Sequence, residues 1–94
     1  MNKDSKEQIL KKIKLFIMET NPTINDLETI PLKESLIEGG YLDSIAFFNL
    51  IMFIEENYQI EFDGNEISID TFNNLTQIID LILKKYNQNE KITK

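Results

Sequence analysis

The sequence predicts an all-α fold, in which a small bundle of helices surrounds one hydrophobic core. Three observations support this prediction. Apolar residues recur at helical spacing in three segments, capping residues precede each segment, and alternating polar and apolar residues never continue long enough to start a sheet. The chain has 94 residues, of which 41% are hydrophobic, and this suits a single domain over residues 1–94 with a small core. We expect its ordered part to span about residues 5–86.

The composition excludes several classes of protein. There is no cysteine and no histidine, so the chain has no thiol nucleophile, no zinc site of the usual kind and no imidazole for acid–base chemistry. A formal net charge of −6 argues against binding nucleic acid through its phosphates. No segment reaches the roughly 18 apolar residues of a membrane span, and the N-terminus lacks the apolar region of a signal peptide. We therefore expect a cytoplasmic monomer with no bound metal and no insertion into a membrane.

The charges are unevenly distributed along the chain. Lysines gather towards both ends, and residues 34–83 hold no basic residue. Ten acidic residues lie in this central block: Glu34, Glu38, Asp43, Glu55, Glu56, Glu61, Asp63, Glu66, Asp70 and Asp80. This distribution favours partners with basic docking surfaces, although such a block also forms an ordinary solvated surface.

The first helix is expected over residues 5–19, after a frayed start. Ser5 and Gln8 fit a capping box, with Asp4 and Glu7 as the alternative pair. The inner face would carry apolar residues at helical spacing: Ile9, Leu10, Ile13, Phe16 and Ile17.

A long connection follows over residues 20–42. Pro22 ends the first helix and Pro31 interrupts any helix within the connection, although a short helical turn near residues 33–38 is compatible with the sequence. A loop of this length in a small domain is often functional. Its scattered apolar residues predict that it packs across the helices.

The second helix, over about residues 44–57, is the most hydrophobic part of the chain. Asp43 and Ser44 stand where an N-cap belongs, after two glycines that allow a sharp entry. A serine hydroxyl is thereby placed at the positive end of a helix, which is a favourable position for a phosphate group. Helical periodicity puts one set of apolar residues on the expected core side: Phe47, Leu50, Ile51, Ile54 and Tyr58.

The opposite side of this helix is predicted to be exposed. Both sides can hardly be core in so small a bundle, and exposed apolar residues beside acids are typical of a docking surface. The residues on this side are Ile45, Phe48, Asn49, Met52 and Glu56. The alternative is that Phe48 and Met52 pack beneath the long connection.

The rest of the chain is expected to add two helices. Asp63-Gly64 is a turn, and its match to a calcium-binding EF-hand loop fails at several ligand positions. A short third helix or helical turn is expected from Ile67, Ile69 and Phe72.

The last helix is expected over residues 75–86, with Asn74 and Gln77 at its cap. Its inner stripe would consist of Leu75, Ile78, Ile79, Ile82 and Tyr86. The polar tail, residues 87–94, is expected to be mobile.

One constellation extends over nearly the whole chain. It begins with Gly40-Tyr41-Leu42-Asp43-Ser44-Ile45 and continues with a helix that ends in Glu55-Glu56. Then come the segment Ile60-Glu61-Phe62, a short helical turn, and Phe72 before an asparagine-capped final helix. Over about residues 5–86, in motif and in order of elements, the chain resembles the acyl carrier protein family.

The resemblance implies a four-helix bundle of the acyl-carrier type, with a long first loop and a short third helix. It also implies that Ser44 is the attachment point of a covalent 4′-phosphopantetheine group from coenzyme A, whose thiol carries acyl intermediates as thioesters. Asp43 matches the aspartate that helps a transferase and its magnesium ion recognise the serine. Such a protein is not an enzyme but a carrier, which presents a tethered substrate to its partners.

The implied partners are a phosphopantetheinyl transferase, an acyl- or aminoacyl-loading ligase, and downstream acyl-transfer or condensing enzymes of fatty acid, polyketide or other specialised biosynthesis. The residues expected to contact these partners are Leu42, Ile45, Phe48, Asn49, Met52, Glu55 and Glu56. The small Gly39 and Gly40 would leave room for the partner's approach.

Departures from the family pattern leave the cargo open. Asn49 stands where many fatty-acid carriers have an acidic docking residue, and Ala46 and Phe47 replace polar residues common beside it. Tyr41-Leu42 before Asp-Ser is similar to stand-alone carriers of specialised pathways and to the D-alanyl carrier of cell-wall modification.

Three hypotheses follow, and an enzyme is the weakest further alternative because no carboxylate pair stands out. The first is a stand-alone acyl carrier that serves a specialised biosynthetic pathway. The second is an aminoacyl carrier, such as a D-alanyl carrier loaded by an adenylating ligase. The third is a helical interaction domain that has kept the fold but is never modified.

Overall fold

The computed structural model describes residues 5–64, 67 and 72–92, and side chains up to residue 85. The elements in this part of the chain are α1 (Lys6–Thr20), the 3-10 turn η1 (Leu27–Thr29), α2 (Ser44–Tyr58) and α3 (Leu75–Ile92). These ranges contain helices and no strands, so the all-α prediction is confirmed for them. The predicted short third helix falls mainly on residues 65–66 and 68–71, outside the described residues.

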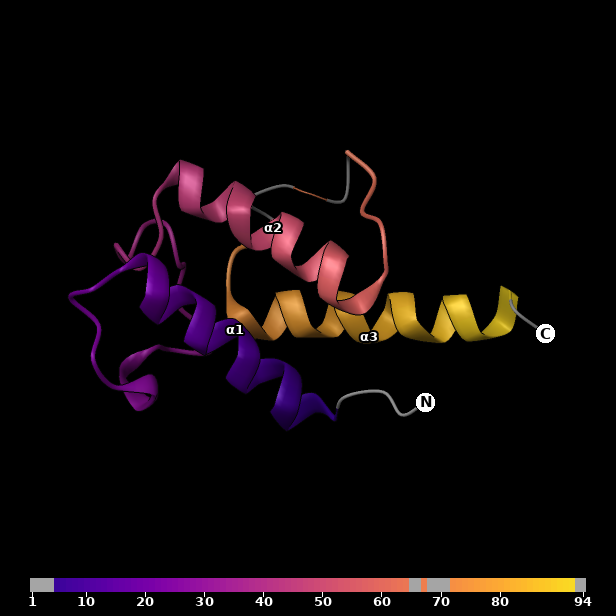
Figure 1. Ribbon diagram of the computed structural model, residues 1–94, viewed down its shortest axis with the longest axis horizontal. Helices are drawn as coiled ribbons and strands as arrows, with labels where there is room; N and C mark the ends of the chain where they lie inside the picture. Colours follow the sequence, from indigo (N-terminus) through magenta and orange to yellow (C-terminus); the bar gives the residue numbers. More distant parts are fainter. Residues whose placement is uncertain (1–4, 65–66, 68–71, 93–94) are drawn as a thin grey trace.

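The three α-helices pack as a bundle around one core. Figure 1 shows that α1 runs in the opposite direction to α2, whereas α2 and α3 run the same way. The long connection and the start of α2 gather at one end of the bundle, and the start of α1 and the end of α3 lie at the other end. The start of α2 is therefore at the opposite end of the bundle from the start of α1.

The first helix begins where its capping residues predict. The Ser5 hydroxyl accepts a hydrogen bond from the Gln8 amide (3.2 Å), and the Gln8 side-chain oxygen accepts one from the Ser5 amide (2.7 Å). This reciprocal pair is the predicted capping box. Ile9, Ile13 and Ile17 are completely buried, which confirms the inner face.

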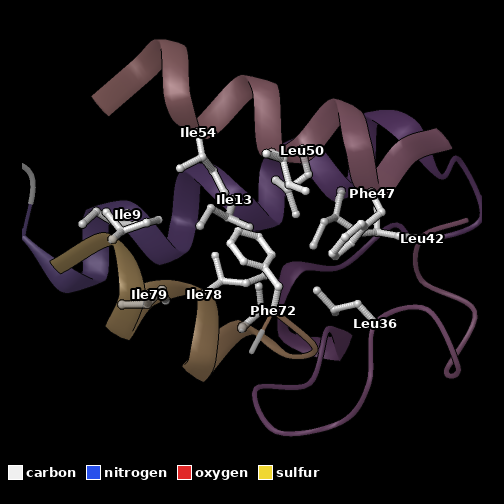
Figure 2. Close-up of a cluster of buried hydrophobic side chains, with 14 of the residues drawn as sticks. Ile9, Ile13, Leu36, Leu42, Phe47, Leu50, Ile54, Phe72, Ile78 and Ile79 are labelled. Atoms are coloured by element: carbon white, nitrogen blue, oxygen red, sulfur yellow. The ribbon is translucent and has the colours of Figure 1, made fainter. Parts of the chain in front are cut away.

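The core joins residues from all three helices and from the connections between them (Figure 2). Phe72 lies at its centre, fully buried, with the ring of Phe47 at 5.7 Å and that of Phe62 at 5.2 Å between centroids. Both ring pairs are edge-to-face, the geometry that aromatic rings prefer. The long connection supplies Leu36 and Leu42 to the same core.

The connection from α1 to α2 is a packed segment, as predicted. Its backbone bonds to the start of α3: the Leu36 amide donates to the Asn73 carbonyl (3.0 Å), and the Thr76 amide donates to the Leu32 carbonyl (3.1 Å). The regular turn lies earlier than expected, at Leu27–Thr29, where Asp26 caps it. The helical turn expected near residues 33–38 lies slightly later, within a turn over residues 36–40, where the Gly39 amide donates to the Ser35 carbonyl (2.9 Å).

The last helix starts as predicted but is longer. The Asn74 side chain accepts from the Gln77 amide (2.9 Å), and the Gln77 side chain accepts from the Asn73 amide (2.9 Å), which together form the cap. The helix continues to Ile92 and does not end near residue 86, because neither proline nor glycine follows to stop it. Leu75, Ile78, Ile79 and Ile82 are buried as expected, and the Tyr86 side chain lies outside the described part. No helix in the described residues is long and apolar enough to cross a membrane.

Candidate functional site

The candidate site lies at the N-terminus of α2, where Asp43 is the N-cap and Ser44 is the first helical residue. An Asp43 carboxylate oxygen accepts from the Ala46 amide (2.8 Å), and the Asp43 carbonyl accepts from the Phe47 amide (2.9 Å). Among the described residues, the amides of Ser44 and Ile45 have no acceptor. The serine hydroxyl therefore lies at the positive end of the helix, close to two free N–H groups.

The Ser44 hydroxyl is exposed and is not used as the cap, because Asp43 fills that role. Loss of this hydroxyl would therefore leave the helix start intact. The chain has no histidine to activate it, and no group of three possible metal ligands occurs in the described ranges. An unactivated serine is a weak nucleophile. The site therefore offers an accessible serine hydroxyl at the start of a helix.

Asn21 holds the backbone that leads into the site, and the sequence did not single it out. It is the C-cap of α1, and its amide nitrogen donates to the carbonyls of Gly40 and Tyr41 at 3.3 Å each. Its side-chain oxygen accepts from the amide (3.2 Å) and the hydroxyl (2.6 Å) of Thr23. The sequence offered one clue, an Asn before a Pro at a helix end, but no indication of the contact nineteen residues away.

The two glycines before the site have backbone roles, and it stays a prediction that they also leave space for a partner. Gly40 has φ of +82°, a left-handed conformation that disfavours other residues. At Gly39, an added Cβ would lie 2.8 Å from the Ser35 carbonyl oxygen and from the Tyr41 ring. They let the chain turn tightly, with the amides of Tyr41 and Leu42 both donating to the Leu36 carbonyl.

A pocket of about 550 Å³ opens beside the serine. Its walls come from the end of α1, the turn before α2 and the first residues of α2, among them Thr20, Asn21, Tyr41, Ser44 and Ala46. Ser44 is itself part of the wall, so a group attached to its oxygen starts at the pocket. Helical periodicity does not predict this pocket, because its walls are distant in the chain.

The exposed side of α2 is the one that the periodicity predicted. Ile45 is 74% exposed, Phe48 63% and Met52 57%, and Asn49 and Glu56 are exposed beside them. The alternative, in which Phe48 and Met52 pack beneath the connection, is wrong for this structure. Single exposed apolar residues are ordinary, but three on one helix face form a patch. We call Ile45, Phe48 and Met52 the apolar stripe.

Two residues expected to contact partners have structural roles in this fold. Leu42 is only 3% exposed and belongs to the core, because the turn after Gly40 directs its side chain inward. Glu55 is half-buried, and its carboxylate accepts from the Phe62 amide (3.0 Å), which ties α2 to the segment after it. Both side chains are less exposed than those of the apolar stripe.

A scan against protein-family models gives no match, and neither does a search of curated proteins.

Proposed function

We propose that the protein is a stand-alone carrier that holds acyl groups as thioesters on a 4′-phosphopantetheine arm at Ser44. The observation that carries this proposal is an exposed serine hydroxyl in the first turn of α2, outside the cap and beside two free amides. The resemblance of the chain to acyl carrier proteins supplies the identity of the group. An arm with a thiol would provide the sulfur chemistry that a chain without cysteine lacks.

The residues present fit a phosphodiester on Ser44. The N–H groups of Ser44 and Ile45 can donate to its oxygens, and the helix dipole favours its negative charge. Asp43 does not compete for these amides, because its carboxylate is bonded to Ala46. In the transfer, the Ser44 oxygen bonds to phosphorus, the phosphoanhydride of coenzyme A breaks, and the nucleotide leaves while the transferase takes the serine proton.

The apolar stripe is the proposed contact for partner enzymes, namely the transferase, a loading ligase and downstream acyl-transfer or condensing enzymes. It begins one residue after Ser44 and continues along the same helix, so a partner seated on it would reach the serine. Exposed Glu56 beside the stripe, with no basic residue between positions 34 and 83, favours a basic rim on the partner. The carrier performs no catalysis in this proposal.

The test is incubation with coenzyme A and a broad-specificity phosphopantetheinyl transferase, followed by intact mass measurement. Wild type should gain the mass of one phosphopantetheine, and Ser44→Ala should gain none. Ser5→Ala is the matched control, since it also changes an exposed serine at a helix start and should still be modified. No gain on wild type would favour an unmodified interaction domain. Loading of the modified protein with acyl or aminoacyl groups would then separate an acyl carrier from an aminoacyl carrier.

A further inference from the structure

The pocket beside Ser44 has the size of a small-molecule site. Its volume of about 550 Å³ lies within the roughly 300–1,000 Å³ of typical ligand pockets. It is formed where the end of α1 meets the turn before α2, and Asn21 bonds these two segments together. Hydrogen bonds therefore hold together the two segments that form the pocket.

Several polar groups of the pocket wall can accept hydrogen bonds from a ligand. The Thr20 hydroxyl donates to the Ile17 carbonyl (3.0 Å), so its lone pairs are what it can offer to a ligand. The carbonyls of Gly40 and Tyr41 each accept one bond from Asn21 and retain a second lone pair. No lysine lines the pocket, and Asp43 is its charged wall residue. Away from the amides of Ser44 and Ile45, such a lining suits a neutral segment of a ligand that carries N–H and O–H donors.

Apolar wall groups complete the lining. Ile37 and Ala46 are half-buried wall residues, and the side chain of Tyr41 is half-buried as well. A ligand that fits has methyl or methylene groups between its hydrogen-bond donors. The pantetheine chain has this composition, with two amide N–H groups, one hydroxyl and a gem-dimethyl carbon along an otherwise aliphatic chain.

We infer that the pocket between the end of α1 and the start of α2 holds the pantetheine segment of the arm on Ser44. This inference depends on the proposed function. The occupant follows from the tether, because Ser44 is part of the wall and an attached chain begins there. Tethering gives an effective concentration on the order of millimolar for short flexible linkers, so weak contacts are sufficient to populate the pocket. The arm then lies against the C-terminal end of α1 and away from the apolar stripe, which remains open to partners.

The test compares ¹⁵N- and ¹³C-labelled protein before and after modification by the transferase. We expect amide shift changes at Thr20, Asn21 and Tyr41, which are distant from Ser44 in sequence or across the pocket, and none at Asn57 at the far end of α2. We also expect nuclear Overhauser contacts from the arm methyl groups to Ile37 and Ala46. Full mass gain with shift changes confined to residues 43–46, and no such contacts, would overturn the pocket and leave the proposed function standing. No mass gain would overturn the proposed function itself.

A pair of threonine variants sharpens the test. Thr20→Val keeps the shape of the side chain but removes the acceptor, so the arm contacts and the Tyr41 shift change should be lost. Thr29→Val is the matched control, because the Thr29 hydroxyl also donates to the carbonyl three residues earlier (2.7 Å) but lies outside the pocket. Both variants should keep the dispersed spectrum and accept the arm. Equal arm contacts in Thr20→Val and wild type would show that the Thr20 hydroxyl does not bind the arm.

Discussion

Two neighbouring phenylalanines on α2 have opposite environments. Phe47 is 8% exposed and makes an edge-to-face contact with Phe72 in the core, whereas Phe48 is 63% exposed. Leu50 and Met52 repeat the difference one turn later. The exposed side carries three large apolar residues together with Asn49 and Glu56, whereas the residues on the buried side are all aliphatic or aromatic.

The two sides of α2 differ in what covers them. The buried side is held by contacts with α1, α3 and Phe72, and its apolar groups stabilise the fold. The exposed stripe leaves apolar surface in water without a partner in the described structure, directly after Ser44. This arrangement supports the proposal that the stripe is a contact surface for other proteins.

The greatest difference in stability is expected between variants of the two phenylalanines. Phe47→Ala should reduce the free energy of unfolding by about 3–5 kcal/mol, since it removes a buried ring and leaves a cavity. Phe48→Ala should change it by less than about 0.5 kcal/mol. Urea unfolding measures both values. An unchanged slope of the unfolding free energy against urea concentration would show that each variant is as compact as wild type. Equal losses in the two variants would show that the stripe is packed and our assignment of the sides is wrong.

A smaller difference in stability is expected between variants of two neighbouring glutamates, Glu55 and Glu56. Glu55→Ala leaves the Phe62 amide without its acceptor, which should cost about 1–3 kcal/mol for a partly buried group. Glu56→Ala, its exposed neighbour, should cost less than about 0.5 kcal/mol. Thermal unfolding at one pH ranks the two variants. If Glu56→Ala is the more destabilising change, the hydrogen bond from the Phe62 amide to Glu55 does not stabilise the segment after α2.

A third pair of variants separates the two roles given to Asp43. Asp43→Ala removes the cap and should cost about 1 kcal/mol, whereas Asp43→Asn keeps a good cap and should cost only a few tenths. Both variants lack the carboxylate that the proposed transferase would recognise, so both should be modified more slowly than wild type. Initial rates of arm attachment, measured well below the unfolding temperature, provide the comparison. A normal rate in Asp43→Asn would limit Asp43 to its role as a cap.

The smallest stability effects are expected on the exposed stripe, where the functional effect should be clear. Met52→Lys and Glu56→Lys should each change the free energy of unfolding by less than about 0.5 kcal/mol, and both should reduce the rate of arm attachment several-fold. Leu15→Lys is the control, because Leu15 is 43% exposed but lies on α1. A large drop in melting temperature for Met52→Lys would assign that residue to the core. An equal loss of rate in Leu15→Lys would mean that added positive charge, and not position, is responsible.

Local patterns predicted most of the fold. The capping pairs at Ser5 and Asn74 and the two sides of α2 depend on residues within one or two turns, and the structure confirms them. The structure extends α3 beyond residue 86, because the polar composition there includes no helix breaker.

The errors at the site come from contacts between distant residues. Leu42 lies next to Asp43 in sequence, but a left-handed Gly40 directs it into the core. Glu55 and Glu56 are chemically alike, and only the later Phe62 amide distinguishes them. The link from Asn21 to Gly40, and the pocket that it frames, likewise depend on a chain path that periodicity does not give.

The most direct measurement is the position of the attached group. Because no lysine lies between Lys33 and Lys84, trypsin releases residues 34–84 as one peptide, which contains Ser35, Ser44 and Ser68. Fragmentation of this peptide after the transferase reaction should place a single phosphopantetheine on Ser44. A group on Ser35 or Ser68, or an unmodified peptide after exhaustive reaction, would contradict the assignment of Ser44 as the attachment point.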